Sequence, residues 1–302
     1  MKIAISGLGK MGMQLVQKLQ ADGHTVVAHD INKTAVDMAV THGALAAYDQ
    51  RSLIAAFGSE QVVLWLMIPA SAVDAVLAGW LELLPKGSLL IDGGNSDFRD
   101  TQRHAELVKE KGSLLMDIGT SGGIWGYEKG FAFMVGGDKA SFPVIEPALA
   151  SLAKPGGAYR YFGPSGAGHF VKMTHNAIEY GMMESLAEGY NLLKAGPYPD
   201  LNLTAAAEVW QHNSVIDSWL NDLCFQILKQ NPNLDGIDGY VAESGEATWA
   251  LEVAKEKGLP LPAIQSAMDV RLASQQGTTN FATKLLAAMR HSFGGHNLNK
   301  ES

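Results

Sequence analysis

Short apolar runs rich in β-branched residues alternate with helical patterns through the first half of the chain. Each run is bounded by glycine, proline, aspartate or serine, which is typical of buried strands. Strands that alternate with helices predict parallel β-α-β units covered by helices on both faces. The predicted strands are Lys2–Ser6, Thr25–Ala28, Val62–Met67, Ser88–Ile91, Leu114–Asp117 and Phe131–Val135.

The pattern changes after the segment Gly163-Pro164-Ser165-Gly166. Strand-like runs disappear and long stretches with helical periodicity take their place. We therefore predict an α/β domain over residues 1–165 and an all-α domain over residues 166–302. The predicted helices of the second domain include Gly168–Lys194, Ala205–Leu220 and Leu261–Ser274.

A glycine-rich segment follows the first predicted strand directly and opens a helical pattern. Its residues form the spacing G-x-G-x-x-G, in which glycines allow a tight turn and bring backbone N–H groups close to a pyrophosphate. A turn without a ligand is the alternative, but a strand before it, a helix after it and a second strand about 20 residues on favour dinucleotide binding. We predict a Rossmann-type domain that binds the cofactor through Gly7, Leu8, Gly9, Lys10, Met11 and Gly12.

Asp30 lies just after the second predicted strand and bears on the choice of cofactor. An acidic side chain at this position binds the two ribose hydroxyls and repels a 2′-phosphate. No arginine adjoins Asp30, although Lys33 lies nearby, so we predict NAD rather than NADP. The alternative is that Asp30 only caps the helix that starts near Lys33.

Four polar residues form a stripe along the long predicted helix Gly168–Lys194. Lys172, His175, Asn176 and Glu179 are spaced i, i+3, i+4 and i+7, which places them on one helix face. Lys172 is a candidate base and Glu179 a candidate acid. A solvated face with ordinary ion pairs is the alternative, but the rest of the helix is largely apolar, so we expect the stripe to line a cleft.

Two glycine-bearing segments follow strands of the first domain, at the strand ends where α/β sheets bind ligands. They are Asp92–Ser96 and Gly119–Gly123. Asn95 and Ser121 can bind substrate hydroxyls, and the successive N–H groups of Ser121, Gly122 and Gly123 can hold a carboxylate. Each segment is otherwise an ordinary turn.

Composition narrows the class of protein further. The 302 residues carry a net charge of −8 without a long basic run, so we expect no nucleic-acid partner. Cys224 is the only cysteine, which excludes an internal disulfide and fits a cytoplasmic protein. The longest apolar run, Val62–Ala70, is too short to span a membrane, and no histidine pair has metal-ligand spacing, so we predict neither a membrane segment nor a metal.

Together these motifs resemble the 6-phosphogluconate dehydrogenases, specifically their short, NAD-preferring bacterial branch, over essentially the whole chain. The related β-hydroxyacid dehydrogenases share the glycine turn, the Ser-Gly-Gly segment and the helix lysine. The stripe that includes both His175-Asn176 and Glu179-Tyr180 matches the 6-phosphogluconate dehydrogenases better. The likeness also rests on Asp92-Gly93-Gly94-Asn95-Ser96, on Arg271 and on the segment from Arg290 to His296.

The resemblance implies oxidative decarboxylation of 6-phosphogluconate to ribulose 5-phosphate, carbon dioxide and NADH, a reaction of gluconate use and the pentose phosphate pathway. It implies that Lys172 takes the proton of the C3 hydroxyl and that Glu179 later protonates C1 of the enediol that remains after carbon dioxide leaves. Residues implied to hold the carboxylate and hydroxyls are Asn95, which also lies at the cofactor, Ser121, Gly122, Gly123, His175 and Asn176. Tyr180, Arg271 and an arginine of the neighbouring subunit, here Arg290, are implied to bind the terminal phosphate.

The sequence departs from the family at the phosphate subsite. Thr248 stands where a lysine or arginine is expected, and Ala250 replaces a threonine. A 6-sulfonated gluconate and plain gluconate therefore stay open as substrates. Two other classes stay open as well: a β-hydroxyacid dehydrogenase that does not decarboxylate, and an NAD-binding sensor without turnover, which the intact Lys172 and Glu179 disfavour.

The helical second half is too small to be a self-contained domain, and the long relatives roughly duplicate it. We therefore expect a homodimer or a dimer of dimers. Arg290 and His296 of the partner subunit would then reach into the cleft of the first copy.

Overall fold

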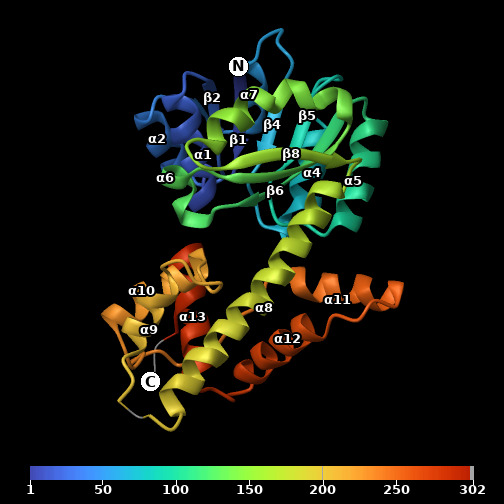
Figure 1. The fold of residues 1–302 in the computed structure, drawn as a ribbon. Coiled ribbons are helices and arrows are strands. Elements are labelled where there is room, and N and C mark those ends of the chain that lie inside the picture. The colour runs from blue at the N-terminus through green and yellow to red at the C-terminus, as the bar shows by residue number, and fades with distance from the viewer. Residues whose placement is uncertain (199, 300–302) are drawn as a thin grey trace. The chain divides into compact units, whose positions relative to one another are not determined.

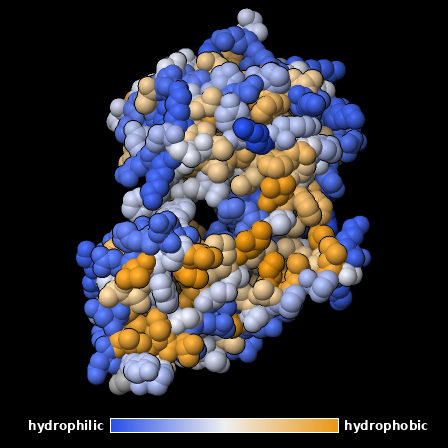
Figure 2. Space-filling model, viewed as in Figure 1, coloured by the Kyte–Doolittle hydropathy of each residue, from blue (hydrophilic) through white to orange (hydrophobic). Residues whose placement is uncertain are grey.

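The computed structural model describes residues 1–198 and 200–299, and the chain divides into two compact units after Met173. Unit 1 is an α/β unit and unit 2 is helical, which confirms the predicted fold class (Figure 1). The division falls within helix α8, Ala167–Ala195. The domain boundary after residue 165 stays a prediction. Figure 2 shows that hydrophobic side chains gather in several patches over the helical unit.

Unit 1 is built on an eight-stranded sheet in the order β3-β2-β1-β4-β5-β6-β7-β8. Neighbouring strands are parallel except β6 and β7, which pair antiparallel. The order reverses between β1 and β4, and ligands bind α/β sheets at such a reversal, beyond the carboxyl ends of the strands. The strands are β1 Lys2–Ser6, β2 Thr25–His29, β3 Leu45–Ala47, β4 Val63–Leu66, β5 Leu89–Asp92, β6 Leu114–Ser121, β7 Ala132–Gly137 and β8 Ala158–Gly163.

Three features of the sheet differ from the sequence prediction. The strands β3 and β8 were not predicted because both are edge strands with several exposed positions rather than continuous apolar runs. The strand β6 runs on to Ser121 instead of ending at Asp117, since Gly119 and Ser121 pair with Met134 and Ala132 of β7. The segment Gly119–Gly123 is therefore mostly strand, and the chain turns only at Gly122.

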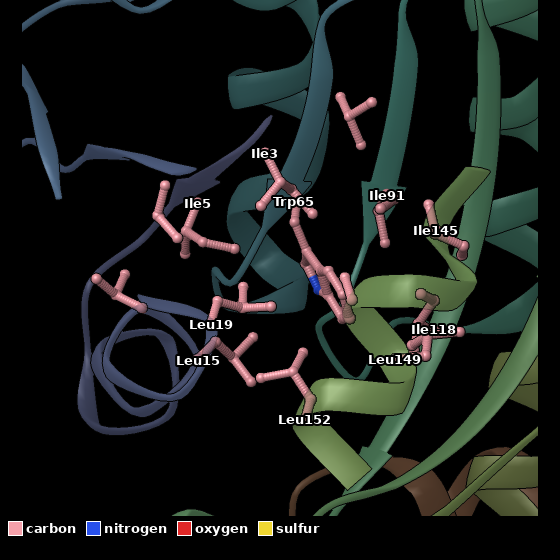
Figure 3. Packing of buried hydrophobic residues seen from close by; sticks show 14 of the residues in the cluster. Ile3, Ile5, Leu15, Leu19, Trp65, Ile91, Ile118, Ile145, Leu149 and Leu152 are labelled. Atoms are coloured by element: carbon pink, nitrogen blue, oxygen red, sulfur yellow. The ribbon is translucent and has the colours of Figure 1, made fainter. Parts of the chain in front are cut away.

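Helices cover both faces of this sheet, as Figure 1 shows. On one face α1 packs against α7, and the buried side chains of this layer include Ile3, Ile5, Leu15, Trp65 and Leu149 (Figure 3). On the other face Ala4, Leu64 and Trp80 belong to a second cluster, because successive strand residues point to opposite faces. The helices of unit 1 are α1 Lys10–Ala21, α2 Lys33–Thr41, α3 Gln50–Ala55, α4 Val73–Leu81, α5 Phe98–Glu110, α6 Gly126–Lys129 and α7 Phe142–Ala153.

Unit 2 consists of helices around a core that includes Tyr190, Cys224, Leu285 and Met289. The predicted helix Ala205–Leu220 is wrong. It is interrupted after Trp210, where Asn213 adopts a positive φ of 65° and Ser218 caps the next helix through the Asn221 N–H. The helices of unit 2 are the later part of α8, α9 Leu203–Trp210, α10 Trp219–Gln230, α11 Glu246–Lys257, α12 Pro262–Gln275 and α13 Phe281–Gly294.

Within residues 1–198 and 200–299, none of the helices has both the length and the apolar character needed to cross a membrane.

Candidate active site

The glycine turn between β1 and α1 lies at the reversal of strand order. Gly7 has a φ of +100°, and a Cβ there would come within 2.4 Å of the Met67 carbonyl oxygen. A Cβ at Gly12 would come within 1.9 Å of the Gly7 carbonyl oxygen, so the turn requires both glycines. Gly9 is the N-cap of α1 and supplies no side-chain cap, and a Cβ there would meet nothing within 4 Å. The N-terminus of α1 is thus bordered by open space at Gly9, which fits a pyrophosphate.

The carboxylate of Asp30 joins the end of β2 to this turn. One oxygen accepts a hydrogen bond from the Leu8 N–H at 2.6 Å, and the other accepts one from the Asn32 N–H at 2.7 Å. The N-cap of α2 is Asn32, whose side chain accepts a hydrogen bond from the Thr34 N–H. Asp30 therefore stands beside the glycine turn and is not the residue that caps α2.

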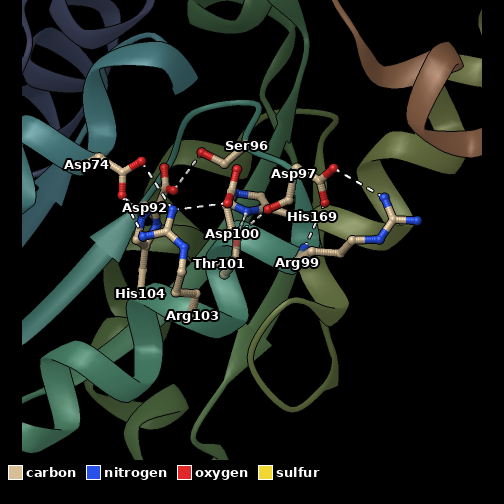
Figure 4. Close-up of polar contacts among 10 residues, drawn as sticks. All are labelled: Asp74, Asp92, Ser96, Asp97, Arg99, Asp100, Thr101, Arg103, His104 and His169. Atoms are coloured by element: carbon tan, nitrogen blue, oxygen red, sulfur yellow. Dashed lines mark hydrogen bonds and ion pairs between the residues drawn. The ribbon is translucent and has the colours of Figure 1, made fainter.

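The loop after β5 is organised by Asp92. Its buried carboxylate accepts hydrogen bonds from the Gly94 N–H at 3.1 Å and from the Ser96 hydroxyl at 2.7 Å (Figure 4). Gly93 lies against the indole of Trp65, since a Cβ there would come within 1.9 Å of its Nε1. Asn95 is exposed between these fixed neighbours. The loop thus presents Asn95 beyond the carboxyl end of the sheet.

A second buried carboxylate, Asp117 on β6, holds the start of α8. Its two oxygens accept hydrogen bonds from the N–H groups of Gly166 and His169, each at 2.9 Å. The imidazole of His169 is itself buried, and its Nδ1 lies 2.7 Å from the Thr101 hydroxyl on α5 (Figure 4). A carboxylate also suits a helix N-terminus electrostatically. The first turn of α8 is therefore anchored both to strand β6 and to helix α5.

Lys172, one turn further along α8, is buried with 6% of its surface exposed. Its stem packs on β6, because a Cβ added at Gly119 would lie only 2.3 Å from the Lys172 Cβ. The same strand leads into Ser121, Gly122 and Gly123, where the two glycines have φ values of 129° and 53°. In unit 1 the stem of the predicted base therefore packs against the strand that leads into the Ser-Gly-Gly segment.

In unit 2, α8 carries the other polar residues of the stripe. Asn176 is buried and donates a hydrogen bond from Nδ2 to Glu246 Oε1 at 2.9 Å. The Oδ1 atom of Asn176 lies 2.9 Å from Nδ1 of His175, which is also 3.9 Å from Glu179 Oε2. The side chains of His175 and Glu179 are partly exposed, at 38% and 22%. In this half of the stripe, the partly exposed His175 therefore contacts Asn176, which is buried and bonded to the buried Glu246.

Tyr180 and Arg271 form a stacked pair between α8 and α12. The guanidinium carbon of Arg271 lies 3.3 Å from the centre of the Tyr180 ring, and Arg271 is fully buried. The Tyr180 hydroxyl accepts a hydrogen bond from the Ser244 N–H at 3.3 Å. Burial, with a smaller contribution from the nearby charge of Arg290, lowers the pKa of Arg271 to about 10.

The two C-terminal candidates differ in their surroundings. Arg290 on α13 is buried, with 6% of its surface exposed, and stands near Arg271 of its own unit. His296 is exposed, and its carbonyl oxygen lies 2.7 Å from Nδ1 of His291.

Sequence reasoning assigned no role to Asp92, Asp117 or Glu246. Asp92 and Asp117 each interrupt an apolar strand pattern with a single carboxylate, which is a detectable signal because an isolated buried charge is costly without partners. Glu246 follows Gly245, which is the N-cap of α11 and has a φ of +99°. Its contact with Asn176 spans 70 positions and has no local signature.

A sheet whose strand order reverses at a glycine turn, followed by a helical unit, is typical of dinucleotide-dependent oxidoreductases. Comparison with known proteins agrees. Residues 2–164 match the model for the NAD binding domain of 6-phosphogluconate dehydrogenase, and residues 168–292 match the model for its C-terminal domain. The chain belongs to the 6-phosphogluconate dehydrogenase family, which confirms the resemblance inferred from the motifs.

Individual relatives cover the whole chain. A Bacillus subtilis protein that is named as a putative 6-phosphogluconate dehydrogenase is 38% identical over 301 residues, covering 100% of both chains. The NAD(+)-dependent, decarboxylating 6-phosphogluconate dehydrogenase of Haloferax volcanii is 36% identical, covering 98% of each. The solved Plasmodium falciparum 6-phosphogluconate dehydrogenase, studied with NADP+ and with 6-phosphogluconate, has a TM-score of 0.82 and 26% identity, covering 98% of this chain and 65% of that one.

Proposed function

We propose that the protein catalyses the NAD-dependent oxidative decarboxylation of 6-phosphogluconate to ribulose 5-phosphate, carbon dioxide and NADH. The observation that carries the proposal is the burial of Lys172 of α8 against β6, the strand that leads into Ser121, Gly122 and Gly123. The family match over both halves of the chain supports it.

In the proposed reaction Lys172, as the neutral amine, takes the proton of the C3 hydroxyl. Bound NAD would supply the acceptor for the hydride that leaves C3. Protonated Lys172 then donates a hydrogen bond to the new keto oxygen while the bond between C1 and C2 breaks and carbon dioxide leaves. Glu179 then protonates the carbon that was C2 of the substrate, which becomes C1 of the ketopentose.

Substrate binding is proposed for backbone groups and for several side chains. The N–H groups of Gly122 and Gly123 follow each other at a turn and suit a carboxylate. Side chains proposed to bind the carboxylate and hydroxyls are Asn95, Ser121, His175 and Asn176. Tyr180 and Arg271 are proposed for the anionic tail of the substrate.

The preference for NAD is proposed from Asp30. Its carboxylate stands beside the glycine turn, where a negative charge disfavours a 2′-phosphate. The relative from Haloferax volcanii is named NAD(+)-dependent, which supports the proposal. The turn residues Gly7 to Gly12 would hold the pyrophosphate, and Asn95 would also lie at the cofactor.

The tail of the substrate is proposed as a phosphate, with a 6-sulfonated gluconate or gluconate as the alternatives. Ala250 is buried and Thr248 is partly exposed, and neither carries a charge. A phosphate would therefore lose one charge-assisted contact worth about 1.5 to 3 kcal/mol. Comparing kcat/KM for the three aldonates settles the choice: negligible turnover of the phosphate beside good turnover of another would overturn it.

We propose a homodimer or a dimer of dimers. Unit 2 leaves Ile178, Met182, Val215 and Ile216 exposed around a hollow of about 550 Å³. A patch of this kind marks an association surface. Arg290 and His296 of the partner subunit are proposed to complete the site, with residues 166–302 as the dimerisation domain and the cytoplasm as the location. A catalytically active monomer in sedimentation at assay concentration would contradict this.

The test is an aldonate panel with NAD that monitors NADH and carbon dioxide together. We expect both products in equal amounts. NADH without carbon dioxide would instead indicate a β-hydroxyacid dehydrogenase, and no turnover of any aldonate would indicate a binding protein. Lys172→Met should abolish NADH formation but leave NAD binding intact.

A matched control is Lys194→Met, because Lys194 lies near the other end of α8 and donates to Asn233. This variant should keep normal turnover. Substantial turnover by Lys172→Met would refute the assignment of the base.

A further inference from the structure

Glu246 is a buried carboxylate that the proposed reaction does not use. It has 2% of its surface exposed and is the first residue of α11. Gly245 before it has a φ of +99°, and a Cβ there would come within 2.9 Å of the Trp249 ring, so the local backbone holds Glu246 at the helix start. The helix dipole favours a negative charge at this position.

One oxygen of Glu246 has a defined partner and the other has none. Oε1 accepts the hydrogen bond from Asn176 Nδ2, whereas Oε2 is buried without a hydrogen-bond partner. An unpartnered buried carboxylate oxygen lowers stability. A contribution to stability therefore does not explain why a glutamate occupies this position, which points to a role in the site.

The bond from Asn176 has a consequence for His175. A carboxylate offers only acceptors, so Asn176 must turn its amide NH₂ toward Glu246 and its carbonyl oxygen toward His175. That oxygen lies 2.9 Å from His175 Nδ1, which must therefore carry a hydrogen. In neutral histidine the lone pair is then on Nε2.

We propose that Glu246 is a positioning residue: through Asn176 it keeps the hydrogen of His175 on Nδ1, so that Nε2 accepts a hydrogen bond from a hydroxyl of the sugar acid. The same link holds the His175 ring beside Glu179, 3.9 Å from Nδ1. This inference rests on the proposed function for its substrate. The contacts that link Glu246 to Asn176 and Asn176 to His175 do not depend on the proposed function.

The test is the tautomer of His175, read from long-range 15N–1H NMR spectra of histidine-labelled enzyme without substrate or cofactor. His175→Asn serves only to assign the signal. The wild type should show the Nδ1–H form. Glu246→Leu, similar in size but without an acceptor, should lose this preference and show an increased Nε2–H form.

Kinetics give the second readout. Glu246→Leu should lower kcat/KM for the aldonate by about tenfold, mainly through KM, because one oriented hydrogen bond to substrate is lost. The melting temperature alone does not separate the two roles, since the substitution removes an unpartnered buried oxygen and also an acceptor of the Asn176 amide. A lower melting temperature with an unchanged tautomer and unchanged kcat/KM would show a merely structural role and overturn the proposal.

Two further variants keep the test decisive. Glu246→Gln retains a carbonyl that can accept from Asn176, so it should keep the Nδ1–H form and a kcat/KM within about threefold of the wild type. If the leucine variant does not fold, loss of the Nδ1–H form in Glu246→Gln overturns the proposal. Glu184→Leu is the matched control, since Glu184 is also buried with one unpartnered oxygen, and it should leave the His175 tautomer unchanged.

Failure of the two proposals can be told apart. If the wild type turns over no aldonate, the proposed function fails while the NMR result still stands. If turnover is normal but His175 carries its hydrogen on Nε2 alone, only the role of Glu246 fails.

Discussion

Lys172 sits so close to Gly119 that a methyl group at Gly119 would lie 2.3 Å from the Lys172 Cβ, nearer than real Cβ contacts come. Gly119→Ala must therefore displace the first turns of α8 from β6. We expect kcat to fall by about 100-fold, since misplacement of a catalytic group by about 1 Å has this effect. Overpacking should also cost about 1–3 kcal/mol in the free energy of unfolding. Steady-state kinetics and urea unfolding measure the two effects.

The control for this variant is Gly189→Ala on the same helix, where an added Cβ meets nothing within 4 Å. It should leave kcat unchanged and gain about 0.5–1 kcal/mol from helix propensity. Normal kcat in Gly119→Ala would show that the close packing of Lys172 has no catalytic importance.

Asp30 should decide the choice between NAD and NADP. Asp30→Asn removes the charge that repels a 2′-phosphate, so the ratio of kcat/KM for NAD to that for NADP should fall at least tenfold. Assays with both cofactors measure it. Asp37→Asn is the control, because Asp37 is an exposed carboxylate on α2 that accepts from Tyr48, and the ratio should stay unchanged. A wild-type enzyme that prefers NADP would refute the role of Asp30.

Asp74 should contribute to stability at low pH. Hydrogen bonds from Arg103 and His104 lower the pKa of Asp74 to about 2 (Figure 4). A lowered carboxyl pKa adds stability above the unfolded value, near 3.8, and this stability is lost as pH falls toward 2. Because 66% of the Asp74 side chain is exposed, we expect at most about 1 kcal/mol.

Unfolding of Asp74→Asn measures this contribution. The variant should be less stable than the wild type at pH 6, and the difference should shrink toward pH 2. Part of the loss should persist at every pH, since the buried His104 ring would keep a weaker partner. Equal stability of the two proteins at pH 6 would contradict the prediction.

Glu184 should have the opposite dependence on pH. Burial, together with repulsion from Glu188, raises the pKa of Glu184 from 4.5 to about 7. A raised carboxyl pKa means that stability falls as pH rises from about 4.5 to about 7, because the buried group must then ionise. Glu184→Gln should therefore be more stable than the wild type at pH 8 by up to about 3 kcal/mol.

Urea unfolding of Glu184→Gln at pH 4.5 and pH 8 checks this, and the advantage should disappear at the lower pH. Glu188→Gln is the control: this exposed residue has only a secondary influence, so most of the pH dependence should remain. A glutamine variant with no advantage at pH 8 would show that Glu184 does not titrate as described.

Local patterns were reliable where one element contains the whole signal. The glycine turn was predicted because strand, turn and helix adjoin in the chain, and α8 was predicted to within one residue at each end. The interruption after Trp210 was missed, since the apolar periodicity continues across it while Asn213 takes a positive φ. The edge strands β3 and β8 were missed because exposed strands lack a continuous apolar run.

The spacing of Lys172, His175, Asn176 and Glu179 on one helix face was determined by the sequence alone, because helix periodicity depends only on neighbours along the chain. The partners of these residues were decided by the tertiary structure. Gly119 lies beneath Lys172 and Glu246 holds Asn176, although the second pair is 70 positions apart. Such contacts depend on how strands pair and helices pack over the whole chain, and no local pattern encodes that arrangement.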